Sequence, residues 1–267
     1  MLTDEQLHAI MPGLAQAKRD TFLPFLHQAL AEFAIDSAPR HAAFLAQLAH
    51  ESGQLRFMEE LWGPTPAQQR YEPPTKLATS LGNTETGDGK RFKGRGPIQI
   101  TGRANYRRYG DLLHVDLVSN PALAALPDLA FRIAGLFWIK NGLNELADQA
   151  SAAAFKQITR RINGGFNGLA DRERFYAVAC KTLGVTASAT GGGASRGRNA
   201  PSSPAETFQR GAEAIRAGSA AKRKRPSSGT RRAGTKRAKP TRRAKPKRAS
   251  GAAAGRRRRA SATKTKT

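Results

Sequence analysis

Disulfides and membrane spans are what this sequence most clearly lacks. Its 267 residues include one cysteine, Cys180, so no disulfide can form within the chain. Because Cys180 follows the apolar run FYAVA, we expect a buried, inert thiol. No stretch approaches the roughly 18 apolar residues of a transmembrane helix. The first residues, MLTDEQLHAIMPG, carry acids and no apolar core of a secretory signal, so we expect synthesis in the cytoplasm without a signal peptide.

The sequence also lacks the motifs of metal and nucleotide sites. Five histidines are present, and none belongs to an HExxH motif or to a His/Cys pair with the spacing of zinc ligands. The tripeptide Gly94-Arg95-Gly96 is not part of a GxxxxGK(S/T) motif, and GxGxxG is absent. We therefore expect a protein without a metal ion or other cofactor.

Acidic residues nearly vanish from the last third of the chain. Residues 1–184 carry 21 Lys and Arg against 18 Asp and Glu, and residues 185–267 carry 24 against 2, so the net charge of +25 divides into +3 and +22. The Gly- and Ser-rich composition of residues 185–220 predicts a flexible linker. Residues 221–267 hold no acid and no aromatic residue, which predicts a disordered tail that attracts polyanions without stacking on bases. DNA, lipopolysaccharide with anionic lipid, and acidic cell-wall polymers all fit as partners.

Strand patterns are scarce, and residues 1–184 are expected to form one mainly α-helical domain. Thr3 and Gln6 have the spacing of a capping box, and Ser37 can cap a helix that ends at Ser52-Gly53. Residues 63–94 are rich in Pro, Gly and Thr, which predicts a long functional loop. At most a small β-hairpin fits near residues 85–101. Apolar spacing predicts the remaining helices over 22–33, 127–141, 152–162 and 172–183, with a short one over 55–62.

Two carboxylates of this domain have positions that suit acid–base chemistry. Glu51 lies three residues after Leu48, on the apolar side of its helix, where partial burial would raise its pKa as a general acid requires. Glu60 follows nine residues later, beside Glu59. If the chain folds back between Glu51 and Glu60, the pair suits inverting glycoside hydrolysis. The alternatives are a Glu51 that turns to solvent or pairs with an Arg, and a pair of surface glutamates.

Four segments occur in this order along the chain: AFLAQLAHESGQL, FKGRGPIQITGRANY, SNPALAALPDLAFRIAGLFW and ITRRINGGFNGLADRERFY. Together they resemble glycoside hydrolase family 19, the chitinase-like family, and within it the compact form found in phage endolysins. The resemblance covers roughly residues 1–184. It implies a two-lobed, lysozyme-like helical fold with a cleft between the lobes and an inverting mechanism.

The resemblance also implies roles for the residues that match the family's motifs. Glu51 of HESG falls on the general acid, and Glu60 falls on the general base. Thr101 falls on the hydroxyl residue that helps hold the attacking water, where chitinases usually have Ser. Arg172 falls on the residue expected to orient a catalytic carboxylate. The other matches are residues of the sugar-binding cleft, namely His50, Gln99, Asn105, Tyr106 and Asn163.

Three aromatic residues are further candidates for contacts with sugar or for the core. Trp62 and Tyr71 could stack on sugar faces, and burial in the domain is the alternative for Trp62. Trp138 lies at helical spacing within an apolar segment, which predicts a core residue.

The sequence departs from the plant members of the family that it resembles. Their disulfides are absent and several substrate-binding loops are missing, which weakens chitin as the substrate. Peptidoglycan glycan strands share the β-1,4-linked N-acetylhexosamine backbone, so we expect a monomeric, endolysin-type glycosidase that acts on the cell wall or in the periplasm after release or delivery. For such an enzyme the tail is expected to bind the anionic envelope. The alternatives are a chitinase, a nucleic-acid-binding protein that acts through the tail, and an antibacterial effector delivered by a secretion machine.

Overall fold

The structure, a computed structural model, describes residues 1–186, and within them all regular structure is helical. The helices are α1 (Asp4–Ile10), α2 (Gln16–Glu32), α3 (Ala38–Glu51), α4 (Pro66–Gln69), α5 (Lys76–Leu81), α6 (Asp88–Arg91), α7 (Arg103–Leu113), the 3-10 helix η1 (Pro121–Ala125), α8 (Pro127–Lys140), α9 (Asn144–Ala147), α10 (Ala152–Asn163) and α11 (Leu169–Leu183). Isolated antiparallel bridges join Arg95 to Glu59 and to Ile100. This agrees with the prediction of a mainly α domain with at most a small hairpin. The predicted tail and nearly all of the predicted linker lie outside the described residues.

Local capping positions the first and third helices as the sequence predicted. The Thr3 hydroxyl accepts a hydrogen bond from the Gln6 backbone at 3.2 Å, and the Gln6 side chain accepts one from the Thr3 backbone at 3.0 Å. The Ser37 hydroxyl caps α3 by accepting a hydrogen bond from the Arg40 backbone at 3.4 Å, and α3 ends at Glu51 with Ser52 as its C-cap. The capped end of α3 therefore places Glu51 at the junction with an irregular segment.

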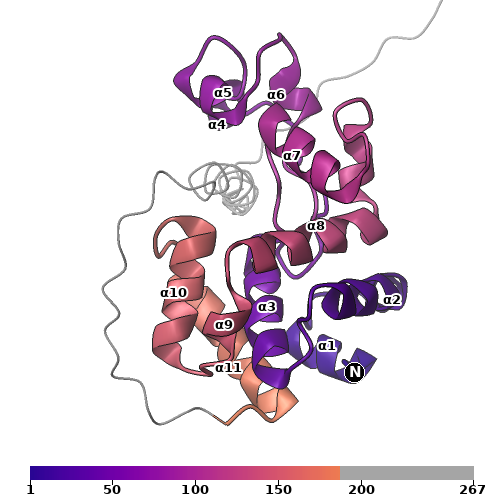
Figure 1. Ribbon diagram of the computed structural model, residues 1–267, viewed down its shortest axis with the longest axis vertical. Coiled ribbons are helices and arrows are strands. Elements are labelled where there is room, and N and C mark those ends of the chain that lie inside the picture. The colour runs from indigo at the N-terminus through magenta and orange to yellow at the C-terminus, as the bar shows by residue number, and fades with distance from the viewer. Residues whose placement is uncertain (187–267) are drawn as a thin grey trace, which may run out of the picture. The chain divides into compact units, whose positions relative to one another are not determined.

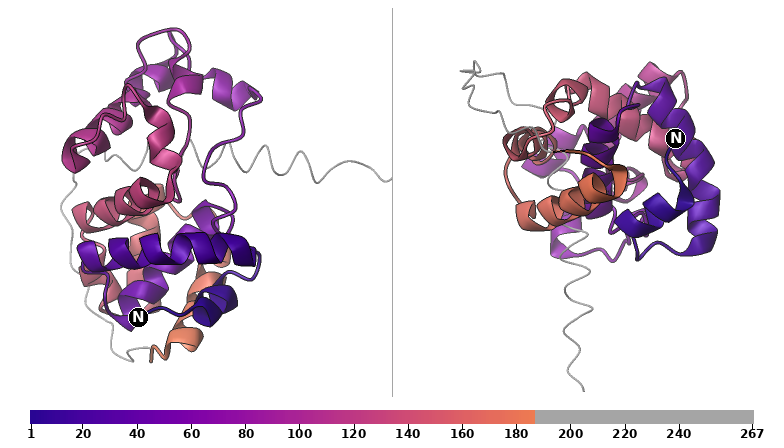
Figure 2. Two further views of the ribbon diagram at one scale, coloured as in Figure 1. Left: turned by 90° about the vertical axis from the view of Figure 1, so that its right-hand side faces the viewer. Right: turned by 90° about the horizontal axis from the view of Figure 1, so that it is seen from below.

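The described helices form two groups. Figure 1 shows α4, α5, α6 and α7 above α8, and α1, α2, α3, α9 and α11 below it, with α10 at their side. In the lower group α3 packs chiefly against α11 and α2 against α8, around the main apolar core; Figure 2 shows α2 running below α8 in its left view. A second, smaller apolar cluster lies in the upper group and consists of Tyr71, Leu77 and Leu81 with partly buried Trp62. The predicted division of a helical domain into two lobes is thereby confirmed.

Two predictions for the region after α3 were wrong. No helix forms over residues 55–62, because Gly53, Gln54 and Leu55 all adopt left-handed backbone angles, with φ of 60°, 64° and 57°. Three such residues in a row reverse the chain instead of continuing a right-handed helix. Residues 63–94 are not one long loop, since they contain α4, α5 and α6. These helices have four to six residues, too few for a hydrophobic period to show in the sequence.

The aromatic and cysteine predictions have mixed outcomes. Trp138 is fully buried, with its ring packed edge-on against Phe44 and its indole N–H donating to Asn144, so its core role is confirmed. Tyr71 is buried in the smaller cluster and cannot stack on a sugar. Cys180 is only half-buried, and burial raises the pKa of its thiol. Among the described helices none combines the length and apolar character needed to cross a membrane.

Candidate active site

Glu51 forms a buried ion pair with Arg172. The Glu51 carboxylate is 8% exposed and accepts a hydrogen bond from Arg172 Nη2, whose side chain is fully buried at the start of α11. The pair joins the end of α3 to α11, the two helices that pack most closely together. A buried carboxylate needs such a partner, because an isolated charge in a protein interior is costly. The sequence left two alternatives to a catalytic Glu51: a side chain that turns to solvent, or one that pairs with an Arg. The first is excluded, and the pairing is observed.

Arg172 is in turn held by Gln47 on α3 and by the loop between α10 and α11. Its Nη1 donates to Gln47 Oε1, and Gln47 Nε2 donates to the Thr159 hydroxyl on α10 at 2.9 Å. Its Nε donates to the Asn167 carbonyl at 3.3 Å, and the Asn163 side chain donates to the same carbonyl at 3.3 Å. This network holds the guanidinium against the catalytic candidate and places Asn163 in the same group of residues.

A second contact between α3 and α11 lies beside the first. His50 Nδ1 hydrogen-bonds to Asp171 Oδ2 at 2.6 Å, one residue before Glu51 on one helix and one residue before Arg172 on the other. Burial would raise the pKa of Asp171, but the hydrogen bond and charge of His50, together with Arg174, lower it. The two adjacent contacts restrict both the position and the rotation of the end of α3.

Glu60 is more deeply buried than Glu51 and is held by neutral donors. It is 1% exposed, and its carboxylate accepts hydrogen bonds from Gln68 Nε2 and from the Gly94 backbone, both at 2.9 Å. The Glu60 backbone N–H donates to the Gly94 carbonyl at 2.8 Å. Burial raises the pKa of Glu60 above its usual value, and the opposing effects of Gly94, Gln68, Lys93 and Arg95 are smaller. A carboxylate with these properties is a stronger base than an exposed glutamate.

The structure distinguishes Glu60 from its neighbour Glu59. The Glu59 side chain is 45% exposed and forms ion pairs with Lys93 at 3.2 Å and with Arg95 at 2.9 Å. The burial and donors of Glu60 therefore support the predicted assignment of the second carboxylate to Glu60.

The segment from Gly94 to Asn105 packs against Glu60. A Cβ atom at Gly94 would lie 2.6 Å from Gln99 Oε1 and 3.4 Å from Glu60 Oε2, so any larger residue would displace the Gln99 side chain. Gln99 donates from Nε2 to the carbonyls of Phe57 and Gly96, while its buried Oε1 meets no donor among residues 1–186. An unsatisfied buried acceptor costs roughly 1–3 kcal/mol of folding free energy. Native proteins keep few such groups, and a functional role is one reason for keeping them.

The next two predicted residues continue this segment. The Thr101 hydroxyl donates to the Gln99 carbonyl at 3.0 Å, and Asn105 Nδ2 donates to the Thr101 carbonyl at 2.8 Å. Thr101 is 1% exposed and Asn105 is 7% exposed. The structure thus brings Glu60, Gln99, Thr101 and Asn105 together as one group.

Tyr106, which was predicted to line the sugar-binding surface, is packed within the upper group of helices. Its ring is fully buried against Phe92, and its hydroxyl donates to the Lys93 carbonyl at 2.6 Å and accepts from Arg95 at 2.8 Å. Burial also raises the pKa of Tyr106, which keeps the hydroxyl protonated as a donor. Tyr106 follows Asn105 on α7, so its side chain points about 100° away around the helix and supports the segment from within the lobe.

Three residues that contact the candidate carboxylates or their neighbours were not predicted from the sequence. Gln68 on α4 contacts Glu60, Gln47 on α3 contacts Arg172, and Asp171 on α11 contacts His50. Gln47 precedes Glu51 by four residues on one helix face, a spacing that was visible in the sequence. Gln68 forms a capping box with Thr65, which was also a recognisable pattern.

The buried ion pair leads to a stability prediction. Substituting Arg172→Met should lower the free energy of unfolding by about 3–5 kcal/mol, because it removes the cation beside a buried carboxylate. Arg132→Met is the matched control, since Arg132 pairs with Glu32 at the surface at 2.7 Å, and it should cost less than about 1 kcal/mol. Urea unfolding of both variants measures the difference. Equal losses would contradict a special role for the buried pair.

Comparisons with known proteins agree on one family. The family model described as Chitinase class I, glycoside hydrolase family 19, matches residues 32–192. An endochitinase of Arabidopsis thaliana is 39% identical over 152 residues, which cover 54% of this chain and 48% of that protein. A glycosyl hydrolase family 19 domain-containing protein of Haemophilus influenzae is 36% identical over 166 residues, with 54% and 80% covered.

Solved structures agree on the fold. Chitinase C from Streptomyces griseus has a TM-score of 0.55 at 23% identity and covers 71% of this chain and 95% of that one. The chain spans about half the length of the Arabidopsis relatives that it matches. No group of three His, Cys, Asp or Glu side chains that could hold a metal ion occurs in the described part of the chain. From the matched family model and the shared fold, the chain belongs to glycoside hydrolase family 19.

Proposed function

We propose that this protein is an inverting glycosidase that hydrolyses β-1,4 bonds between the N-acetylhexosamines of bacterial peptidoglycan. One observation carries the proposal. Two buried carboxylates, Glu51 and Glu60, each have dedicated hydrogen-bond donors and are joined by a tight turn within a family 19 domain. Inverting hydrolysis requires two such carboxylates, one to protonate the leaving oxygen and one to activate water.

The two carboxylates have different tasks in this mechanism. Glu51 acts in its protonated form, in which one oxygen still accepts the hydrogen bond from Arg172, and transfers its proton to the glycosidic oxygen as the bond to the anomeric carbon breaks. Glu60 takes a proton from a water molecule, whose oxygen forms the new bond to the anomeric carbon from the opposite face. Thr101 helps to hold this water, Arg172 orients Glu51, and His50, Gln99, Asn105 and Asn163 contribute to the sugar-binding surface. The proton lost by Glu51 is replaced in the next step by the one that Glu60 received, through solvent.

Two features of the sequence and the names of its relatives bear on the choice of substrate. Chitin is the second candidate, because the Arabidopsis and Streptomyces relatives are named chitinases. Peptidoglycan is favoured by the single cysteine and by the missing substrate-binding loops, which leave fewer subsites for a long neutral polymer. The proposed enzyme acts as a monomer on the cell wall or in the periplasm, after release or delivery.

Products released from purified peptidoglycan test the proposal. Mass spectrometry should find muropeptides with a saturated reducing end after treatment with the wild-type protein, and none after treatment with Glu51→Gln. The reducing-end sugar identifies the bond that is cut. Turnover of soluble chitooligosaccharides without any release from peptidoglycan would replace the proposal by chitinase activity.

The basic tail carries a separate proposal about attachment. Residues 185–267 have a net charge of +22, and we propose that they bind the anionic envelope, with nucleic acid as the alternative partner. Removing residues 185–267 should leave hydrolysis of purified sacculi within about twofold of the full chain, while lysis of whole cells at low salt falls roughly tenfold or more. Turbidity assays on both substrates measure this. Equal lysis of whole cells by both proteins would refute envelope attachment.

A further inference from the structure

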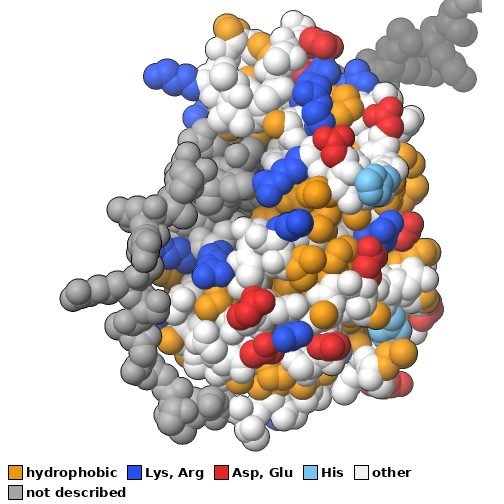
Figure 3. Space-filling model, in the orientation of Figure 1, with side chains coloured by type: hydrophobic (Ala, Val, Ile, Leu, Met, Phe, Trp, Pro, Cys, Tyr) orange, Lys and Arg blue, Asp and Glu red, His pale blue; other side chains and the backbone are white. Residues whose placement is uncertain are grey.

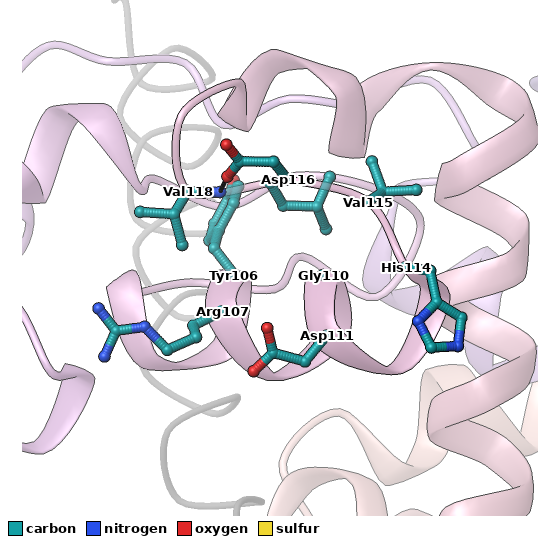
Figure 4. A pocket seen from close by; sticks show the side chains of 9 residues that line it. Tyr106, Arg107, Gly110, Asp111, His114, Val115, Asp116 and Val118 are labelled. Carbon is teal, nitrogen blue, oxygen red and sulfur yellow. Dashed lines mark hydrogen bonds between the residues drawn. The ribbon is translucent and has the colours of Figure 1, made fainter.

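A basic groove lies where α7 passes the end of α8. It has a volume of about 540 Å³ and is lined by Ala104, Arg107, Arg108, Asp111, Leu112 and Lys140, all exposed. Figure 3 shows Lys and Arg side chains beside hydrophobic ones between the upper and lower helices on this face. Figure 4 shows Arg107 and Asp111 one turn apart on α7, at the edge where the groove adjoins a second hollow formed by α7 and residues 115–118.

The cations of this groove form no ion pairs with carboxylates of the described residues. Among residues 1–186 no Asp or Glu forms an ion pair with Arg107, Arg108 or Lys140, and Asp111 forms none either. By contrast, Arg103 at the start of the same helix is paired with Asp88 at 2.6 Å. The groove therefore has three cations against one carboxylate, together with the apolar side chains of Ala104 and Leu112.

Each wall of the groove belongs or is bound to a helix that carries a candidate site residue, Asn105 on α7 and Asn163 on α10. On α7, Ala104 directly precedes Asn105 and follows Thr101 by three residues, and Arg108 lies about 6 Å further along the helix axis. On the other wall, the residues after Lys140 are bound to α10, since Arg161 donates to the carbonyls of Asn141 and Gly142 at 2.8 and 3.0 Å. Because Ala104 and Asn105 are consecutive residues of α7, the groove begins one residue away from a candidate sugar contact.

We propose that this groove binds the carboxylate-bearing stem peptide of peptidoglycan, an inference that rests on the proposed function. The stem is a short peptide, attached through the lactyl ether of every second sugar, that alternates alanine methyl groups with free carboxylates. Guanidinium groups pair with carboxylates in a bidentate geometry, and Ala104 and Leu112 provide contact area for the methyl groups. Chitin offers neither group, because its only substituents are hydroxyls and neutral acetamides. The groove thus selects peptide-bearing strands over bare ones.

A second basic hollow serves as the control. It has a volume of about 620 Å³, and its cations are Lys90, Arg91, Lys93 and Arg95. Its cations Lys93 and Arg95 pair with Glu59, and the other two, Lys90 and Arg91, lie on α6. Replacing Lys90 and Arg91 of this hollow therefore tests whether any surface cation attracts the anionic strand to a similar extent.

The test compares intact strands with strands stripped of their peptides by an amidase. The measured quantity is the ratio of kcat/KM on intact strands to kcat/KM on stripped strands. We expect a ratio of roughly ten for the wild type, the combined size of two exposed charged contacts, and a ratio near one for Arg107→Gln/Lys140→Gln. The charge-conserving variant Arg107→Lys/Lys140→Arg should keep most of the preference. The matched control Lys90→Gln/Arg91→Gln, which removes one Lys and one Arg from the other hollow, should keep it in full.

The outcomes separate this inference from the proposed function. A wild-type ratio near one would leave a peptidoglycan glycosidase in place and refute the peptide-binding groove. An unchanged ratio in Arg107→Gln/Lys140→Gln, or an equal fall in the control, would also refute it. Partial unfolding of a variant lowers both rates and leaves the ratio unaltered. Failure of the wild type to cut either kind of strand, with chitooligosaccharides cut, would refute the proposed substrate and the groove's ligand together.

Discussion

Glu51→Gln should lower kcat on peptidoglycan strands by roughly 10³-fold, with KM changed little, because general acid catalysis contributes about 10²–10⁴. Glutamine keeps the size of the side chain and an oxygen that can accept the hydrogen bond from Arg172. It has no proton to give to the leaving oxygen. The rate at which reducing ends appear, followed over a range of substrate concentrations, measures both constants.

A matched control separates this loss from a general effect of removing a carboxylate. Glu173 lies on α11 like Arg172, but its side chain is 40% exposed. Its ion pair with Lys156 is a long one, at 3.8 Å. Glu173→Gln should retain kcat within about twofold, since exposed pairs contribute little. A Glu51→Gln protein that kept a tenth or more of the wild-type kcat would refute Glu51 as the general acid.

Glu60→Gln should lower kcat by roughly 10²–10⁴-fold, because the amide cannot take a proton from the attacking water. The adjacent Glu59→Gln is the matched control, and it should lose less than about tenfold because it disturbs only an exposed ion-pair cluster with Lys93 and Arg95. The same assay of reducing ends compares the two variants. Thermal unfolding of both variants checks that the comparison is made on folded protein.

The order of the two losses is the informative result. A larger loss in Glu59→Gln than in Glu60→Gln would move the base to Glu59, against the burial of Glu60 and its hydrogen bonds from Gln68 and Gly94. Equal and small losses would leave hydrolysis without an identified base and contradict the inverting mechanism.

The sequence by itself determined the local features of this protein. The capping box at Thr3, the cap at Ser37 and the end of α3 at Glu51 follow from contacts within four residues, and all are present. The helices α8 and α10 follow the predicted apolar periods to within one residue at each end, and α11 begins three residues before its predicted start. Four motifs in order also indicated the family. Such features are visible in the sequence because the interactions that produce them join near neighbours.

Only the tertiary structure decided how the candidate site is held. Glu51 and Arg172 are 121 residues apart, and their ion pair exists because α3 packs on α11. The difference in burial between Glu60 and Glu59 depends on which carboxylate the Gly94 segment covers, and the burial of Tyr106 depends on how α7 meets Phe92. The groove between α7 and Lys140 likewise joins residues from separate helices. Burial and long-range pairing arise from packing, which no local pattern encodes, so these features required the folded chain.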